Sequence, residues 1–429
     1  MIEIFNCIYL TIFFLILFRL QFIDKISEKY FDIKNFSLIE KYSINILIIF
    51  FTLLLFSFFK FNNLILVFSL FTLSLLTFLL NIKKKISKKN FINKDIFFIF
   101  IFTFIISINL VANLKLEWDG HFWYFKALNF YENLSFFNLA DTPLSRPEYP
   151  HLGGVIWALF WKISFLNYEF FGRMIYIFVY VISILLIAEK ITNNINLKLL
   201  FILILFFLTF DHYLFSGYQE YLLFGLTIII FNFLNKLDLK KLNYFNGIFL
   251  ILSSYLLVWV KNEGIFYFSS IILYIIYFQP IKKKLLFLFI SSSLIFIRMF
   301  LFDKATGHIS IPGLNLDIDF LKTFNFSFSN FIFEIFLITK HAIIAFFKYP
   351  IWLLFFFSLF LKKIDKKEIH IIYFSSFSLI FIYAIFLNSQ ADLNWHLSVT
   401  LDRVLFQLSS FFMIFLSFRL QYFMKKFIS

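Results

Sequence analysis

The sequence predicts an all-α fold: a polytopic bundle of about twelve to fourteen transmembrane helices, with interfacial helices in the first large outer loop. Two observations predict this class. Hydrophobic residues make up 61% of the 429 residues and charged residues only 15%, whereas soluble domains carry about 25% charged residues. The mean hydropathy of +0.87 agrees. The net charge of +14 is not carried by a hydrophilic fold, which argues against a nucleic-acid partner.

Apolar segments long enough to span a bilayer recur along the whole chain. A transmembrane helix needs about 20 such residues, and about thirteen segments qualify. The first of them lacks a basic start and a small-residue cleavage site, so we expect a retained helix and no signal peptide. The single cysteine, Cys7, excludes a disulfide within the chain and a cysteine-based metal site. The segments are 4–22, 42–60, 62–81, 95–114, 170–189, 198–216, 219–235, 243–260, 264–279, 285–302, 342–361, 369–388 and 403–420.

Lysine-rich links between these segments predict their orientation, because basic loops stay on the cytoplasmic side. All the links fall on that side only if residues 151–166 do not cross the membrane. This short segment carries His151 and Lys162, so we expect a helix along the outer interface, with Trp157 and Trp161 at headgroup level. The N-terminus is then outside and the C-terminus inside. The lysine-rich links are 83–94, 236–241, 282–284, 362–367 and 425–426.

Three regions follow from this topology. Residues 1–94 form an N-terminal extension of three spans. Residues 95–302 form a core that contains the longest outer loop, 115–150, and the interfacial helix 151–166. Residues 303–429 add an outer loop, 303–330, and three further spans.

The outer loop 115–150 opens with a carboxylate among aromatic residues. Asp119 lies between Trp118 and the pair Gly120-His121, at the outer end of a span. A carboxylate at that position suits a general base that works at the membrane surface. The alternative interpretation is an ordinary charge at a helix end.

Charged residues also stand in the other outer links, which are otherwise apolar. The segment GYQEY contributes Glu220, and VKNEG contributes Lys261 and Glu263. Charges between apolar helices are costly and usually functional, although VKNEG also fits a tight turn closed by a glycine. The segment 391–407 contributes His396 and Arg403. Further outer candidates are Arg146 and His151. The guanidinium group of an arginine can bind a phosphate through two hydrogen bonds.

The order of these motifs resembles the GT-C superfamily of membrane glycosyltransferases, especially its protein-mannosyltransferase-like and aminoarabinose-transferase-like bacterial members. In those enzymes an acidic residue opens the first outer loop, and a proline-containing segment follows, which Glu148–Leu152 approximates. A second acidic turn, similar to GYQEY, and a lysine-bearing turn, similar to VKNEG, come next. The resemblance covers roughly residues 95–279. Asp119-Gly120-His121 replaces a strict D-x-D, and three spans precede the core, whereas typical members begin with the loop-bearing span.

The resemblance implies transfer of a sugar from a polyprenyl-phosphate donor to a lipid, glycan or protein acceptor, with inversion, on the extracytoplasmic face of the bacterial cytoplasmic membrane. Asp119 would be the catalytic base, and Glu220 a second acid that orients acceptor or sugar. The leaving phosphate needs cationic stabilisation. We expect it from Lys261, with Arg403 or Arg146 as helpers. The remaining expected substrate contacts are His121, His151, Glu263 and His396.

We expect no cofactor. Asp119, His121 and Glu220 offer ligands for a divalent metal, but their spacing is not diagnostic. The resemblance includes many metal-independent enzymes, which also favours a site without metal.

Two other functions fit part of the pattern. An O-antigen ligase or polymerase would carry its largest outer loop late in the chain, whereas the loop 303–330 has only Lys304 and Lys322 as basic residues besides His308. A transporter or flippase of lipid-linked saccharides would show charges at the bilayer midplane and inverted repeats, and the sequence shows neither.

The predicted topology can be tested by cysteine-accessibility labelling. Asp141→Cys should react with an impermeant reagent from outside, because residue 141 belongs to the first outer loop. Lys284→Cys should react only from the cytoplasmic side. Labelling of both positions from one side would contradict the topology.

Overall fold

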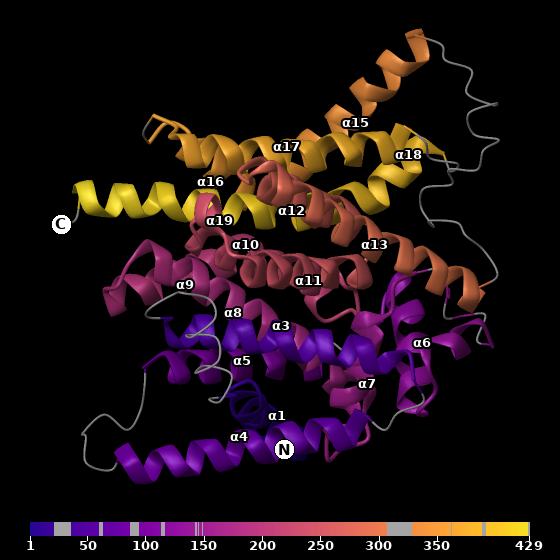
Figure 1. The fold of residues 1–429 in the computed structure, drawn as a ribbon, viewed down its shortest axis with the longest axis vertical. Coiled ribbons are helices and arrows are strands. Elements are labelled where there is room, and N and C mark those ends of the chain that lie inside the picture. The colour runs from indigo at the N-terminus through magenta and orange to yellow at the C-terminus, as the bar shows by residue number, and fades with distance from the viewer. Residues whose placement is uncertain are drawn as a thin grey trace.

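The computed structural model describes most of the chain as α-helix (Figure 1). Among the described residues there are seventeen α-helices and no β-strand, which confirms the all-α class. The described residues are 1–20, 36–59, 63–85, 94–112, 116–141, 144, 146–147, 149–306, 328–361, 363–387 and 392–427.

The helices of the N-terminal half end mostly where polar residues interrupt the apolar runs. Ser37 caps the second of them, because its hydroxyl accepts from the Glu40 amide at 3.2 Å and the Glu40 carboxylate accepts from the Ser37 amide at 2.8 Å. The helices are α1 Ile2–Leu17, α3 Leu38–Ser57, α4 Asn63–Lys85, α5 Lys94–Ala112, α6 Asp119–Tyr131, α7 Leu152–Ile163, α8 Met174–Ile191 and α9 Ile195–Thr209, with the 3-10 turns η1 Phe136–Asp141 and η3 Glu169–Arg173.

The C-terminal half continues the pattern of apolar helices joined by short links. Its helices are α10 Glu220–Lys236, α11 Tyr244–Val260, α12 Gly264–Tyr277, α13 Ile281–Thr306, α15 Phe328–Lys348, α16 Ile351–Ser358, α17 Lys366–Leu387, α18 Leu393–His396 and α19 Asp402–Phe427. Short turns join some of them: η4 His212–Leu214, η5 Leu239–Lys241 and the π-helical turn η6 Leu397–Leu401.

Helix α8 is the centre of the bundle. Its apolar stretch is entirely buried, and α10, α19, α5 and α9 pack around it. Aromatic rings fill the contacts, as where Phe178 of α8 stacks on Phe18 with ring centroids 5.2 Å apart. The core is therefore built mainly from rings and aliphatic side chains of the long helices.

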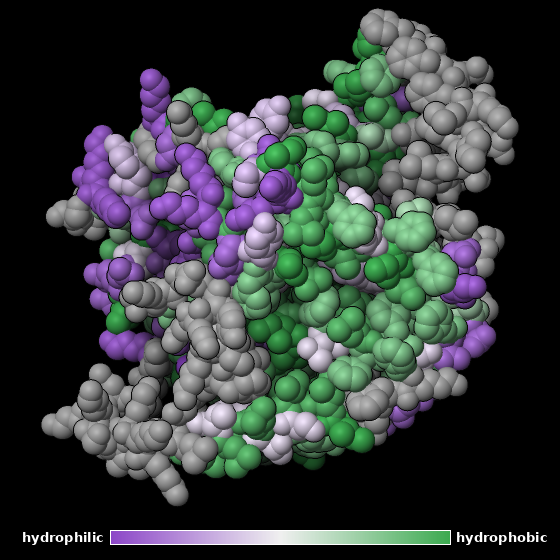
Figure 2. Space-filling view, viewed as in Figure 1, coloured by the Kyte–Doolittle hydropathy of each residue, from purple (hydrophilic) through white to green (hydrophobic). Residues whose placement is uncertain are grey.

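The outer helices expose apolar side chains. Phe289 and Phe296 of α13 are each 70% exposed, and Figure 2 shows a broad hydrophobic area across the middle of one face. Large exposed apolar surfaces mark membrane or protein contacts. Within the described residues, five helical segments are long and apolar enough to cross a membrane: Leu38–Ser57, Lys94–Ala112, Glu169–Ile191, Ile281–Ala305 and Leu393–Lys426.

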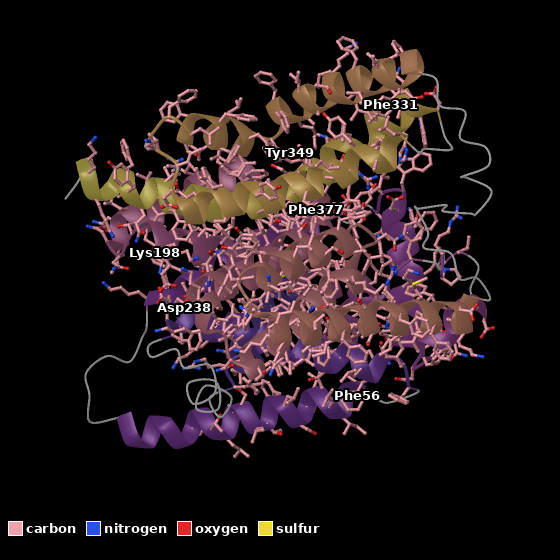
Figure 3. All side chains as sticks on the ribbon, turned by 45° about the horizontal axis from the view of Figure 1, so that its top comes forward. Phe56, Lys198, Asp238, Phe331, Tyr349 and Phe377 are labelled. Carbon is pink, nitrogen blue, oxygen red and sulfur yellow. The ribbon has the colours of Figure 1, made fainter. Side chains whose placement is uncertain are left out.

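Basic links gather at one end of the bundle, here called the lysine-rich end. Lys198 pairs with Asp95 at 2.8 Å, and Lys236 pairs with Glu40. Lys283 donates to the Leu242 carbonyl at 2.5 Å, which joins the links on both sides of α11 and α12. Helix α19 ends with exposed lysines on the left in Figure 1, where Figure 2 shows a group of hydrophilic residues. Figure 3 places the labelled Lys198 and Asp238 toward the same side.

Several predicted spans have different bounds in the structure. The segment 342–361 is not one helix: α15 ends at Lys348 and α16 begins after Pro350, because proline lacks the amide that would continue the helix. Helix α9 ends at Thr209, well before residue 216. The predicted loop 303–330 begins inside α13, and its residues 307–327 lie outside the described residues.

The predicted interfacial helix exists as α7, but its surroundings differ from the prediction. Trp157 is fully buried and Trp161 is 8% exposed, so both rings pack against protein instead of facing a lipid surface. The reason is close packing under α6: a Cβ on Gly154 would meet the Cβ of Lys126 at 2.8 Å. The indole of Trp157 donates to the Glu169 carbonyl at 2.8 Å. Helix α7 is thus an internal support for α6 at the end of the bundle opposite the lysines (Figure 1).

Candidate functional site

A cavity of about 710 Å³ opens at the end of the bundle opposite the lysine-rich end. Its walls come from the start of α6, the α11–α12 turn, α17 and the segment from α18 to α19. The lining residues are Glu117, Trp118, Asp119, Phe122, Trp123, Tyr149, Tyr213, Tyr218, Lys261, Asn262, Glu263, Phe266, Lys348, Ile382, Ile385, Phe386, Trp395, His396, Ser398, Val399, Thr400, Asp402, Arg403 and Val404.

The start of α6 is held against the link before α10. A Cβ on Gly120 would lie 2.2 Å from the Ser216 carbonyl oxygen, so only glycine allows this approach. Gly217 has φ +82°, a conformation that also favours glycine. These contacts bring Asp119, the first residue of α6, beside Glu220, the first residue of α10.

Arg403 joins the two carboxylates from the opposite wall. Its Nη1 lies 3.1 Å from an oxygen of Asp119 and 3.4 Å from one of Glu220. The guanidinium stacks on the ring of Tyr218, with its carbon 4.6 Å from the ring centroid. A π-helical turn directly precedes this part of α19, a local feature that is frequent at functional sites.

Lys261 completes the network from the α11–α12 turn. Its ammonium lies 2.9 Å from Glu220 and 3.3 Å from Glu263. Burial favours the neutral amine, but the two carboxylates outweigh burial and raise the pKa of Lys261 above its usual value. Lys261 is therefore a cation at neutral pH. Glu220 is only 1% exposed, so it holds both cations from within the protein.

Both cations keep hydrogen-bond donors for a ligand. An ammonium has three N–H groups, and the partners of Lys261 among the described residues are two carboxylates. Arg403 uses Nε on the Val399 carbonyl and Nη1 on the carboxylates, so Nη2 has no partner in the described part of the chain. Because both residues line the cavity, these donors suit an anion such as a phosphate.

A second charged group in the same cavity was not predicted. Lys348 pairs with Asp402 and lies 5.3 Å from the ring centroid of Tyr213. The next residue, Tyr349, donates to Asp211 at 2.9 Å and lies beside α19 in Figure 3. The prediction missed Lys348 because it placed the residue inside a span. The signal was the Tyr-Pro pair that follows, which ends the helix at this lysine.

The structure brings five of the predicted site residues into one ion network: Asp119, Glu220, Lys261, Glu263 and Arg403. A sixth, His396, lines the cavity, and its ring centroid lies 4.9 Å from that of Phe386.

Three predicted binding residues lie elsewhere. His121 is exposed and does not line the cavity. Arg146 does not line the cavity, although its guanidinium carbon lies 5.2 Å from the ring centroid of Phe122, which does. His151 is fully buried and its Nε2 hydrogen-bonds the Ser57 hydroxyl at 2.7 Å.

The surroundings of His151 indicate a structural role. Its ring centroid lies 4.5 Å from that of Phe136 and 5.0 Å from that of Trp259. Burial, and then the charges of Lys126 and Arg298, lower the pKa of His151 well below its usual value, so the ring is neutral at pH 7. In this structure His151 is therefore enclosed by the protein and does not line the cavity.

No three histidine, cysteine or acidic side chains converge as a metal site among the residues that the structure describes. Within the suggested set of Asp119, His121 and Glu220, the two carboxylates share Arg403, whereas His121 lies outside the cavity.

Comparisons with known proteins give no match. No family model matches the chain, no curated protein matches its sequence, and no solved structure matches its fold.

Removing the charge of Glu220 should destabilise the protein. In Glu220→Gln both cations lose their shared buried partner, and breaking a buried ion pair costs about 3–5 kcal/mol. Denaturant unfolding of the purified protein in detergent measures the loss. Glu263→Gln is the matched control: among the described residues the side chain of Glu263 forms an ion pair with Lys261 alone, and it is 17% exposed, so a loss of about 1 kcal/mol is expected. Equal losses in the two variants would contradict a central role for Glu220.

Proposed function

We propose that the chain is an integral membrane glycosyltransferase that moves a sugar from a polyprenyl-phosphate donor to an extracytoplasmic acceptor. The observation that carries the proposal is the ion network of the cavity. One carboxylate, Asp119, is 45% exposed there. It lies near two cations, Lys261 and Arg403, which keep N–H donors for a ligand. A general base and a phosphate clamp are the two components that such a transfer requires.

The distribution of charge supports membrane insertion with the cavity outside. In the part of the chain that the structure describes, five helical segments are long and apolar enough to cross a bilayer, and outer helices such as α13 expose apolar rings. Basic links favour the cytoplasmic side. If the lysine-rich end is cytoplasmic, the cavity opens on the extracytoplasmic side of a bacterial cytoplasmic membrane, at the depth where a lipid phosphate would lie.

Donor binding would change the partners of Asp119. The phosphate and Asp119 would compete for Arg403, because both are anions suited to the same guanidinium. A carboxylate engaged by arginine is a poor proton acceptor. Once the phosphate takes over the guanidinium, Asp119 is free to accept a proton.

The transfer is then a single inverting displacement. Asp119 takes the proton of the acceptor hydroxyl while its oxygen bonds to the anomeric carbon. The bond from that carbon to the phosphate oxygen breaks, and the electron pair leaves with the phosphate. Lys261 and Arg403 stabilise the growing negative charge on the leaving oxygen.

Glu220 has a different role in this proposal from the one expected of a second catalytic acid. It is buried and does not line the cavity, so it would not contact acceptor or sugar. One of its oxygens lies close to both Lys261 and Arg403. Glu220 is a positioning residue that keeps the two cations at a distance that suits one phosphate.

The role of the base can be tested with Asp119→Asn. The amide keeps the shape of the side chain but cannot take a proton, so sugar transfer should fall at least about 10²-fold. The assay is transfer from a synthetic polyprenyl-phosphate sugar by protein reconstituted in liposomes. Glu132→Gln, an exposed residue just after the far end of α6, is the matched control and should transfer normally. Near-normal transfer by Asp119→Asn would rule out this base.

The role of Lys261 is tested by Lys261→Met. An interaction that strengthens as the phosphate leaves should affect turnover at saturating donor as well as donor affinity. The alternative is an ion pair with carboxylates that has no part in turnover. Lys241→Met changes an exposed lysine near the other end of α11 and serves as the control. Wild-type turnover and donor affinity in Lys261→Met would exclude the phosphate role and make Arg403 the next candidate.

A further inference from the structure

Two of the seven tryptophans are exposed, whereas the other five are buried. Trp118 is 85% exposed and Trp395 is 59% exposed, and both line the cavity. The remaining five tryptophans of the chain all belong to described segments and are at most 8% exposed. They are Trp123, Trp157, Trp161, Trp259 and Trp352.

The backbone at Trp118 is strained. This residue has φ 22° and ψ −98°, a conformation that L-residues with large side chains rarely adopt. Such strain costs about 1–3 kcal/mol and clusters at functional sites. The indole gains little packing in return, because 85% of the residue is exposed. The residue in this conformation lines the cavity and directly precedes Asp119.

The cavity that these rings line also carries polar side chains of several kinds. Ser398 and Thr400 contribute hydroxyls, and Asn262 contributes an amide. Hydroxyls, amides and carboxylates beside flat apolar rings suit a carbohydrate, whose hydroxyl groups need hydrogen bonds and whose ring faces are apolar. A lipid chain would instead suit the aliphatic wall formed by Ile382 and Ile385 of α17.

A membrane-interface belt does not explain this placement. Belt tryptophans lie at headgroup level at both membrane interfaces. In this chain, both exposed tryptophans line a single cavity, and no tryptophan among the described residues is exposed at the lysine-rich end.

We infer that Trp118 and Trp395 form the acceptor subsite, and that the acceptor is a carbohydrate whose rings stack on the two indoles. Naming the ligand an acceptor rests on the proposed function. In that reaction the stacked sugar would present its hydroxyl to Asp119, the residue after Trp118. The inference selects a glycan, free or carried by a lipid or protein, as the group that receives the transferred sugar.

Tryptophan fluorescence tests the subsite without requiring activity. In the full-length protein in nanodiscs, iodide should quench the two exposed indoles, and mannotriose or N-acetylchitotriose at millimolar concentration should protect them. In Trp118→Ala, Trp395 remains as the reporter, and half-protection should need at least tenfold more oligosaccharide than in Trp118→Tyr, which keeps a ring. The reciprocal pair Trp395→Ala and Trp395→Tyr is compared with Trp118 as reporter. Phe207→Ala, at an exposed ring of α9 away from the cavity, should leave protection unchanged.

Three results would overturn the inference. The first is that neither oligosaccharide protects the indoles, and the second is that the alanine and tyrosine variants are protected equally. The third is that brominated lipids in the nanodisc quench both indoles, as they would quench rings that anchor the protein in the membrane. Kinetics separate this inference from the proposed function. If the wild type transfers sugar and the alanine variants keep the acceptor KM, only the subsite is wrong. If oligosaccharide protects the indoles but no transfer occurs, the carbohydrate site stands and the proposed reaction is wrong.

Discussion

The buried ion network around Glu220 is the interaction on which the architecture of the cavity depends. Taking charged groups out of water is costly unless they are paired closely. Arg403, Lys261 and Glu220 are all largely buried, so the helices that carry them must meet in one arrangement. Asp119 and Arg403 are 284 residues apart in sequence, yet they bond at 3.1 Å. The first loop and the last helix are thereby held together at one end.

Packing against small residues supports the network. The start of α6 approaches the Ser216 carbonyl as closely as a glycine allows, and α7 approaches α6 through Gly154. Because α7 is enclosed, α6 rests on protein rather than on lipid or water. This support explains how Asp119, which is partly exposed, still has a defined position beside Arg403.

Charge is divided between the two ends of the bundle. At the lysine-rich end, pairs such as Lys198 with Asp95 lie near exposed lysines, and the links of α10 to α13 meet there. At the opposite end, carboxylates and cations meet in the cavity. The long apolar helices between these ends keep the two groups apart. The same separation serves membrane insertion in the proposed function, because a bilayer excludes unpaired charge from its centre.

The sequence by itself determined the helical class, the approximate positions of most helices and the charged residues that form the ion network around Glu220. Composition and apolar length carry that information, and charges between apolar helices stand out. Only the tertiary structure decided which charges meet. His151 looked like a surface residue, but rings from η1 and α11 enclose it, and those contacts cross long stretches of sequence. Lys348 reaches the cavity at the end of α15, where Pro350 breaks the helix, and its partner Asp402 comes from another helix. Apolar patterns report burial along one helix, whereas a site depends on how separate helices pack.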